Sequence, residues 1–81
     1  MLRLEKKTSL SPEDAVKRAI AFFGPKGYGL TVHEESATCA KFEGAGGTVE
    51  VTSCAEGKGS SVEVVSQEWD VQAKEFMSKM K

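Results

Sequence analysis

The sequence predicts a single two-layer α+β domain, residues 1–81, with the element order β-α-β-β-β-β-α. Three observations support this fold class. The middle of the chain alternates apolar and polar residues, as strands do, whereas segments near both ends repeat apolar residues with helical spacing. Glycine-rich breaks separate the alternating segments, as hairpins require. We therefore expect an antiparallel meander sheet with both helices on its one apolar face.

The composition fits one small folded domain. Hydrophobic residues make up 40% and charged residues 28% of the 81 residues. A formal charge of −1 lacks the basic bias of a dedicated nucleic-acid binder, so we expect no nucleic-acid partner. No apolar run reaches the ~20 residues of a membrane-spanning helix, and the first residues carry no signal-peptide core. We accordingly expect a cytoplasmic domain with no membrane partner.

The opening residues predict a strand and then a helix. Leu2 and Leu4 alternate with charged residues, which is typical of a short strand. Ser11 can accept a hydrogen bond from the amide of Asp14, and Pro12 suits the first helical position because its missing amide needs no partner there. The helix that follows carries one apolar stripe, at Val16, Ala19, Ile20 and Phe23.

The first helix has a solvated face and a clear end. Lys17 and Arg18 lie off the apolar stripe and should be solvated. Gly24 should end the helix in the left-handed conformation, followed by Pro25, which cannot continue it.

A second helix is predicted near the end of the sequence. From about Gln67 the apolar period changes to that of a helix. Its apolar face comprises Trp69, Ala73, Phe76, Met77 and Met80.

The register of the two later hairpins follows from their turns. A loop centred in 44–47 places Phe42 opposite Val49. A turn at Gly57 and Lys58 gives the following hairpin a register in which its apolar residues coincide with the same face. A slip of one residue would turn a strand's apolar side chains outward, so this agreement supports a single inner face.

The first hairpin completes that face. Alternation places Val32 opposite Ala40 and Leu30 opposite Phe42, again with apolar residues inward. The remaining side chains form a mostly polar outer face that should meet water. They are His33, Cys39, Lys41, Glu50, Thr52, Cys54, Glu63 and Val65.

The order of elements resembles the helix-grip, or TBP-like, arrangement, in which an antiparallel sheet wraps a C-terminal helix. The nearest family is the START and polyketide-cyclase-like (SRPBCC) superfamily, of which this chain resembles a shortened member. The likeness is topological, and in sequence it rests on 42–51, 57–64 and the helix opened by Trp69. It implies that the first strand pairs with the last and that Leu30–Glu35 is an open edge. Full-size members enclose a ligand cavity with more strands and a longer final helix, and they share no catalytic motif that could be transferred.

Five residues are candidates for the lining of a ligand pocket. Strict alternation puts Glu34 on the inner face, where two interpretations are open. Glu34 lies at the rim of the sheet, or it is buried near Thr38, Ser53 and Ser66. In the second case these small polar residues would line a pocket together with Trp69, whereas in the first they are ordinary packing residues with satisfied hydroxyls.

The residues that most often carry chemistry form no pattern here. Cys39 and Cys54 should be diagonal neighbours on the outer face, too far apart for a disulfide, and we expect free thiols. His33 and Glu34 should point to opposite faces, which excludes a catalytic pair. With one histidine and no paired cysteines, we expect no metal site and no cofactor.

No motif assigns an activity, and the hypotheses come from the fold. The leading one is a noncatalytic binding or interaction module, whose partner protein or second copy would pair with the edge strand Leu30–Glu35. The alternative is a helix-grip module that binds a small apolar molecule or lipid in a reduced cavity between sheet and helices. An enzyme of the cyclase type would need a buried acid with a shifted pKa, and Glu34 is the one candidate.

Overall fold

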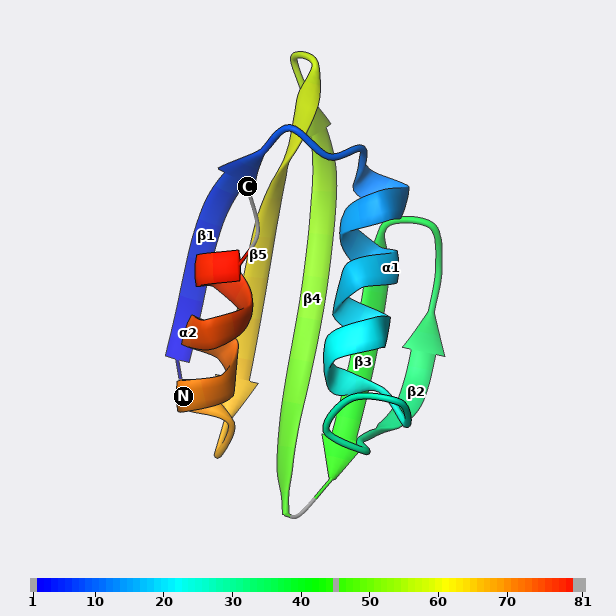
Figure 1. Cartoon of the computed structure of the whole chain (residues 1–81), viewed down its shortest axis with the longest axis vertical. Helices are drawn as coiled ribbons and strands as arrows, with labels where there is room; N and C mark the ends of the chain where they lie inside the picture. Colours follow the sequence, from blue (N-terminus) through cyan, green and yellow to red (C-terminus); the bar gives the residue numbers. More distant parts are fainter. Residues whose placement is uncertain (1, 45, 80–81) are drawn as a thin grey trace.

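A computed structural model describes residues 2–44 and 46–79 of the chain. It is a five-stranded antiparallel sheet in the order β1-β5-β4-β3-β2, with two helices on one face (Figure 1). The predicted α+β fold class and element order are confirmed. The elements are β1 (Leu2–Thr8), α1 (Pro12–Phe23), β2 (Thr31–Glu35), β3 (Cys39–Gly44), β4 (Gly47–Glu56), β5 (Gly59–Gln67) and α2 (Asp70–Lys79).

The central strands follow the predicted register. Phe42 pairs with Val49 and Val51 pairs with Val64, so the side chains that alternate inward on these strands share one face. Helix α1 packs over β3, β4 and β5, whereas α2 packs over β1 and β5. The buried apolar residues between the two layers are Ala15, Val16, Ala19, Phe23, Leu30, Ala40, Phe42, Val49, Val51, Val62, Val64, Ala73, Phe76 and Met77.

The expected register of the β2–β3 hairpin is wrong. Val32 pairs with Phe42 instead of Ala40, and the pairing shifts between Val32 and Glu34. This irregularity is a β-bulge, in which one strand contributes an extra residue. The extra residue puts His33 and Glu34 on the same side of the strand, because two residues here face a single partner. The strict alternation assumed from the sequence therefore ends after Val32.

The two ends of α1 are held by backbone and side-chain hydrogen bonds. The hydroxyl of Ser11 accepts from the Asp14 amide at 3.3 Å, as predicted. Gly24 does not take the left-handed conformation expected of it, since its φ is −70°. Its amide donates to the Ile20 carbonyl at 2.8 Å, and a Cβ on Gly24 would collide with that same oxygen. Glycine is needed at this position for close approach of the chain to α1.

Helix α2 begins later than the sequence pattern indicates. Strand β5 continues to Gln67, which pairs with Thr48. The chain then turns at Glu68, whose φ is +70°, and α2 starts at Asp70 instead of near Gln67. On α2 the predicted apolar face is confirmed for Ala73, Phe76 and Met77, which are buried, whereas Trp69 lies just before the helix. Met80 lies outside the described residues.

Candidate functional site

Two of the five candidate pocket residues lie at the surface. The bulge in β2 turns Glu34 to the outer face, where its side chain is 59% exposed and its Oε2 lies 3.9 Å from Lys41 Nζ. The interpretation that buries Glu34 is therefore wrong. Thr38 is exposed in the turn between β2 and β3.

The two candidate serines are buried but lie apart. Ser53 lies on β4, and Ser66 lies on β5 opposite Val49 of β4. Val49 and Ser53 are four residues apart along β4. That separation is about 13 Å at the rise of a β-strand. The Ser53 hydroxyl donates to the Pro12 carbonyl at 2.9 Å, while Ser66 Oγ has no partner among the described residues. The serines therefore do not converge on one ligand position.

Trp69 has a structural contact that the sequence pattern does not indicate. Its indole Nε1 donates to the Gly44 carbonyl at 2.9 Å, and its ring lies 5.9 Å from the ring of Tyr28. Trp69 thus ties the start of α2 to the β3–β4 hairpin and to the loop before β2. The five candidate residues do not line a common pocket.

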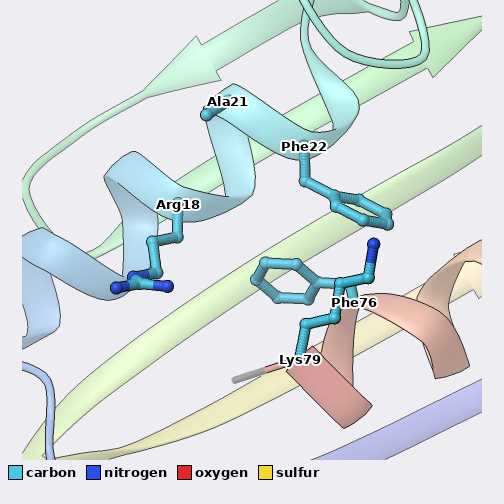
Figure 2. Close-up of a pocket in the computed structure, with 5 residues that line it drawn as sticks. All are labelled: Arg18, Ala21, Phe22, Phe76 and Lys79. Atoms are coloured by element: carbon cyan, nitrogen blue, oxygen red, sulfur yellow. The ribbon is translucent and has the colours of Figure 1, made fainter. Parts of the chain in front are cut away.

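A hollow of about 260 Å³ lies instead between α1 and α2 (Figure 2). Arg18, Ala21 and Phe22 line it from α1, and Phe76 and Lys79 line it from α2. The rings of Phe22 and Phe76 meet across the gap with 5.5 Å between their centroids. Phe76 is 3% exposed, so its ring closes the bottom of the hollow as part of the core, while Phe22 is only half-buried.

Two cations flank these rings. Lys79 Nζ lies 5.5 Å from the centroid of Phe22, within the range of a cation–π interaction. The Arg18 guanidinium lies one turn of α1 before Phe22, as Figure 2 shows. Both side chains are on exposed residues, so their charges remain available to an anion.

A second hollow of about 250 Å³ adjoins the first. The two share Ala21, Phe22 and Lys79, and the second adds Gly27, Tyr28 and Glu75. We call the two hollows together the interhelical groove. At its far end the Tyr28 hydroxyl donates to Glu75 Oε1 at 2.8 Å. This hydrogen bond, followed by partial desolvation and the charge of Glu75, raises the pKa of Tyr28 above its ordinary value.

The outer face of the sheet also has a hollow, beside β2, β3 and β4, and its polar side chains contact one another. His33 Nε2 lies 3.1 Å from Glu43 Oε1, and Lys41 Nζ lies 3.9 Å from Glu50 Oε2. The prediction that His33 and Glu34 point to opposite faces is wrong because of the bulge, but each has a different partner.

Metal ligands and cysteines add no further site in the described part of the chain. Within residues 2–44 and 46–79, no three or more His, Cys, Asp or Glu side chains gather where they could hold a metal ion. Cys39 and Cys54 are both free thiols, as predicted.

Comparison with known proteins gives no relative. No protein-family model, curated protein or solved structure matches this chain. The resemblance to the START and polyketide-cyclase-like superfamily stays a prediction, as does a cytoplasmic location. Neither α1 nor α2, the helices among the described residues, has the length and apolar character needed to cross a bilayer.

The sequence contained a signal for the groove that apolar periodicity alone does not reveal. Phe22 falls outside the stripe of Val16, Ala19, Ile20 and Phe23, yet it is aromatic and lies four residues after Arg18. This spacing puts the two side chains next to each other on the surface of α1. Lys79 cannot be assigned to the same site without the packing of α2 against α1.

Proposed function

We propose that this domain is a noncatalytic interaction module whose interhelical groove binds a short acidic segment of a partner protein. One observation carries the proposal: Arg18 and Lys79 flank the rings of Phe22 and Phe76 at a surface hollow. The rings offer an apolar contact for one side chain of the partner. The cations attract carboxylates on either side of it, which favours acidic segments over neutral or basic ones. Glu75, the carboxylate in the groove lining, lies at the far end, where Tyr28 donates a hydrogen bond to it.

The openness of the groove favours a peptide over an enclosed small molecule. Small-molecule sites commonly bury most of the ligand. The two hollows of the groove, of about 260 and 250 Å³, both lie at the surface, so a small molecule in either one would stay largely exposed. Between sheet and helices the space is filled by side chains such as Phe23 and Val51, neither of which is exposed. These features give less support to a small apolar ligand or lipid in a reduced helix-grip cavity.

A partner at the predicted edge strand stays a prediction with weaker support. β2 is an edge strand of the sheet, as expected for Leu30–Glu35. However, β2 is short, its pairing is interrupted by the bulge, and Glu34 and Glu35 are exposed on it. Short and bulged edge strands are protected against addition of another strand, because the bulge interrupts the row of backbone groups. The groove therefore has the better geometry for a protein partner.

Fluorescence anisotropy with a synthetic peptide tests the proposal. The probe is a fluorescein-labelled peptide with one phenylalanine flanked by glutamates, and the matched probes replace either the glutamates by lysines or the phenylalanine by alanine. We expect the acidic phenylalanine peptide to bind best. Arg18→Glu and Lys79→Glu should each weaken its binding by about tenfold, because each replaces an attraction by a repulsion.

Two variants serve as charge-matched controls. Lys17→Glu makes the same change on α1 one residue away from the groove lining, and Lys58→Glu makes it in the β4–β5 turn. Both should bind as the unmodified protein does. The proposal is wrong if no probe binds, if the lysine peptide binds as well as the acidic one, or if the control variants lose as much affinity as Arg18→Glu. Circular dichroism confirms that each variant is folded.

A further inference from the structure

The edge strand at the opposite side of the sheet is regular. β1 pairs with β5 from Leu2 opposite Ser66 to Thr8 opposite Ser60, with no shift of register. Its other side has no neighbouring strand among the described residues. An unbroken edge of this kind presents a row of backbone amides and carbonyls that can pair with a further strand.

Helix α2 steadies β1 without occupying that edge. It packs on the inner face of β1 and β5, and β1 runs along the side of the sheet in Figure 1. Lys6 Nζ donates to the Met77 carbonyl at 2.8 Å, near the negative end of α2. Leu2 and Leu4 are half-buried and pack against the core. The strand is therefore held in an extended shape that is ready for pairing.

We propose that β1 pairs with β1 of a second copy of this chain, antiparallel and with Leu4 facing the partner's Leu4. The two sheets would then form one continuous sheet around a two-fold axis at Leu4. In this register Arg3 faces the partner's Glu5, and Glu5 faces the partner's Arg3. Opposite charges directly across an antiparallel pair stabilise it, and here the pair occurs twice.

The inner face agrees with the same register. The two Leu4 side chains meet at the axis, and Leu2 lies beside the methylene stem of the partner's Lys6. Because the ammonium of Lys6 is bound to the carbonyl of Met77 in its own chain, its stem remains available as apolar surface. The pairing therefore joins apolar groups on the inner face and opposite charges on the outer face.

Neighbouring symmetric registers are less favourable. A shift that centres the axis on Glu5 places the two Glu5 side chains opposite each other and Arg3 opposite the partner's Lys7. Centring it on Lys6 brings two Lys6 side chains together on the inner face, and centring it on Arg3 brings two arginines together. Like charges directly opposite each other are destabilising. The charge pattern of β1 thus selects the axis at Leu4.

The pairing within one chain supplies a second argument. Glu5 lies directly opposite Glu63 on β5, a like-charged pair in the β1–β5 ladder. Within one chain, Arg3 Nε lies 3.7 Å from Glu63 Oε2, so Glu63 already has a cation beside it while Glu5 faces the free edge. The partner's Arg3 would give Glu5 a cation of its own. This inference does not depend on the function of the interhelical groove, which lies between α1 and α2 and away from this edge.

Charge-swap variants in sedimentation equilibrium test the dimer, with the chain at micromolar to millimolar concentrations. We expect the unmodified protein to dimerise reversibly. Arg3→Glu and Glu5→Arg should each weaken the dimer by about tenfold or more, because each creates two like-charged pairs. The double variant Arg3→Glu/Glu5→Arg restores opposite charges in the same register and should dimerise again.

Glu34→Lys on β2 is the matched control and should leave the association unchanged. A mixture of isotope-labelled and unlabelled chains should give intermolecular nuclear Overhauser effects at Leu4. A protein that stays monomeric at millimolar concentration would overturn the inference. So would a double variant that is folded by circular dichroism but remains monomeric, or intermolecular contacts that map to β2.

Discussion

The two edge strands of the sheet differ in regularity and in how they are anchored. β1 pairs with β5 along Leu2–Thr8 without interruption, and its inner side chains pack against the core at several points. β2 pairs with β3 over a shorter and bulged stretch. Val32 packs against the core from β2, and Leu30, just before the strand, is 1% exposed. The difference shows that a regular backbone edge is present at β1 and an interrupted one at β2.

The largest expected effect concerns the way each edge is anchored. Leu30→Ala should lower the free energy of unfolding by about 2–5 kcal/mol, because it opens a cavity at a fully buried position. Leu4→Ala on β1 should cost about 1–2 kcal/mol, since Leu4 is only half-buried. Denaturant unfolding followed by the fluorescence of Trp69, the one tryptophan, measures both values. Equal losses in the two variants would contradict the difference in anchoring.

A smaller difference in stability is expected between variants of two buried serines of β5, which pair with opposite ends of β1. The Ser60 hydroxyl donates to the Leu10 carbonyl at 2.9 Å, so Ser60→Ala should cost about 1 kcal/mol. Ser66 Oγ has no partner among the described residues, so Ser66→Ala should be neutral or stabilising. Thermal unfolding of the two variants side by side provides the measurement. A larger loss for Ser66→Ala would show that its hydroxyl has a partner after all.

The smallest expected effect is on the pKa of Tyr28, whose hydrogen bond joins the loop before β2 to α2, the helix over β1. Because the Tyr28 hydroxyl donates to Glu75, the pKa of this single tyrosine should lie above its ordinary value of 10.0, and Glu75→Ala should lower it toward that value. A raised pKa means that the folded state holds the proton more tightly than the unfolded state. The stabilisation is therefore complete below pH 10 and lost as the pH rises through the pKa of the folded state. Absorbance at alkaline pH follows the phenolate, and identical titrations of both proteins would contradict the link.

The sequence was sufficient to predict the elements whose pattern and turns agree. Val49, Val51, Val62 and Val64 alternate without interruption, and glycines set the turns at both ends of β4, so the register of these strands follows from local rules. The register predicted for β2 is wrong because the bulge changes the face of every residue after it. His33 and Glu34 carry no local signal for an extra residue, and the bulge depends on pairing with β3.

The candidate site is harder to predict from the sequence than the fold. Alternation predicts pocket residues on the inner face of the sheet, but Ser53 on β4 and Ser66 on β5 lie at different heights along the two strands. The interhelical groove depends on the placement of α2 beside α1, which brings Lys79 to Phe22 across more than fifty residues of chain. Helical periodicity identifies which face of each helix is apolar, but it does not define the gap between two helices.

Chemical-shift mapping tests most directly whether the interhelical groove, and not β2, receives the partner. The ¹⁵N-labelled protein is titrated with the acidic phenylalanine peptide, and the backbone amide shifts are followed residue by residue. We expect the largest shifts at Phe22, Phe76 and Lys79 and essentially none over Thr31–Glu35. Shifts concentrated on Thr31–Glu35, or none anywhere at saturating peptide, would contradict binding in the groove.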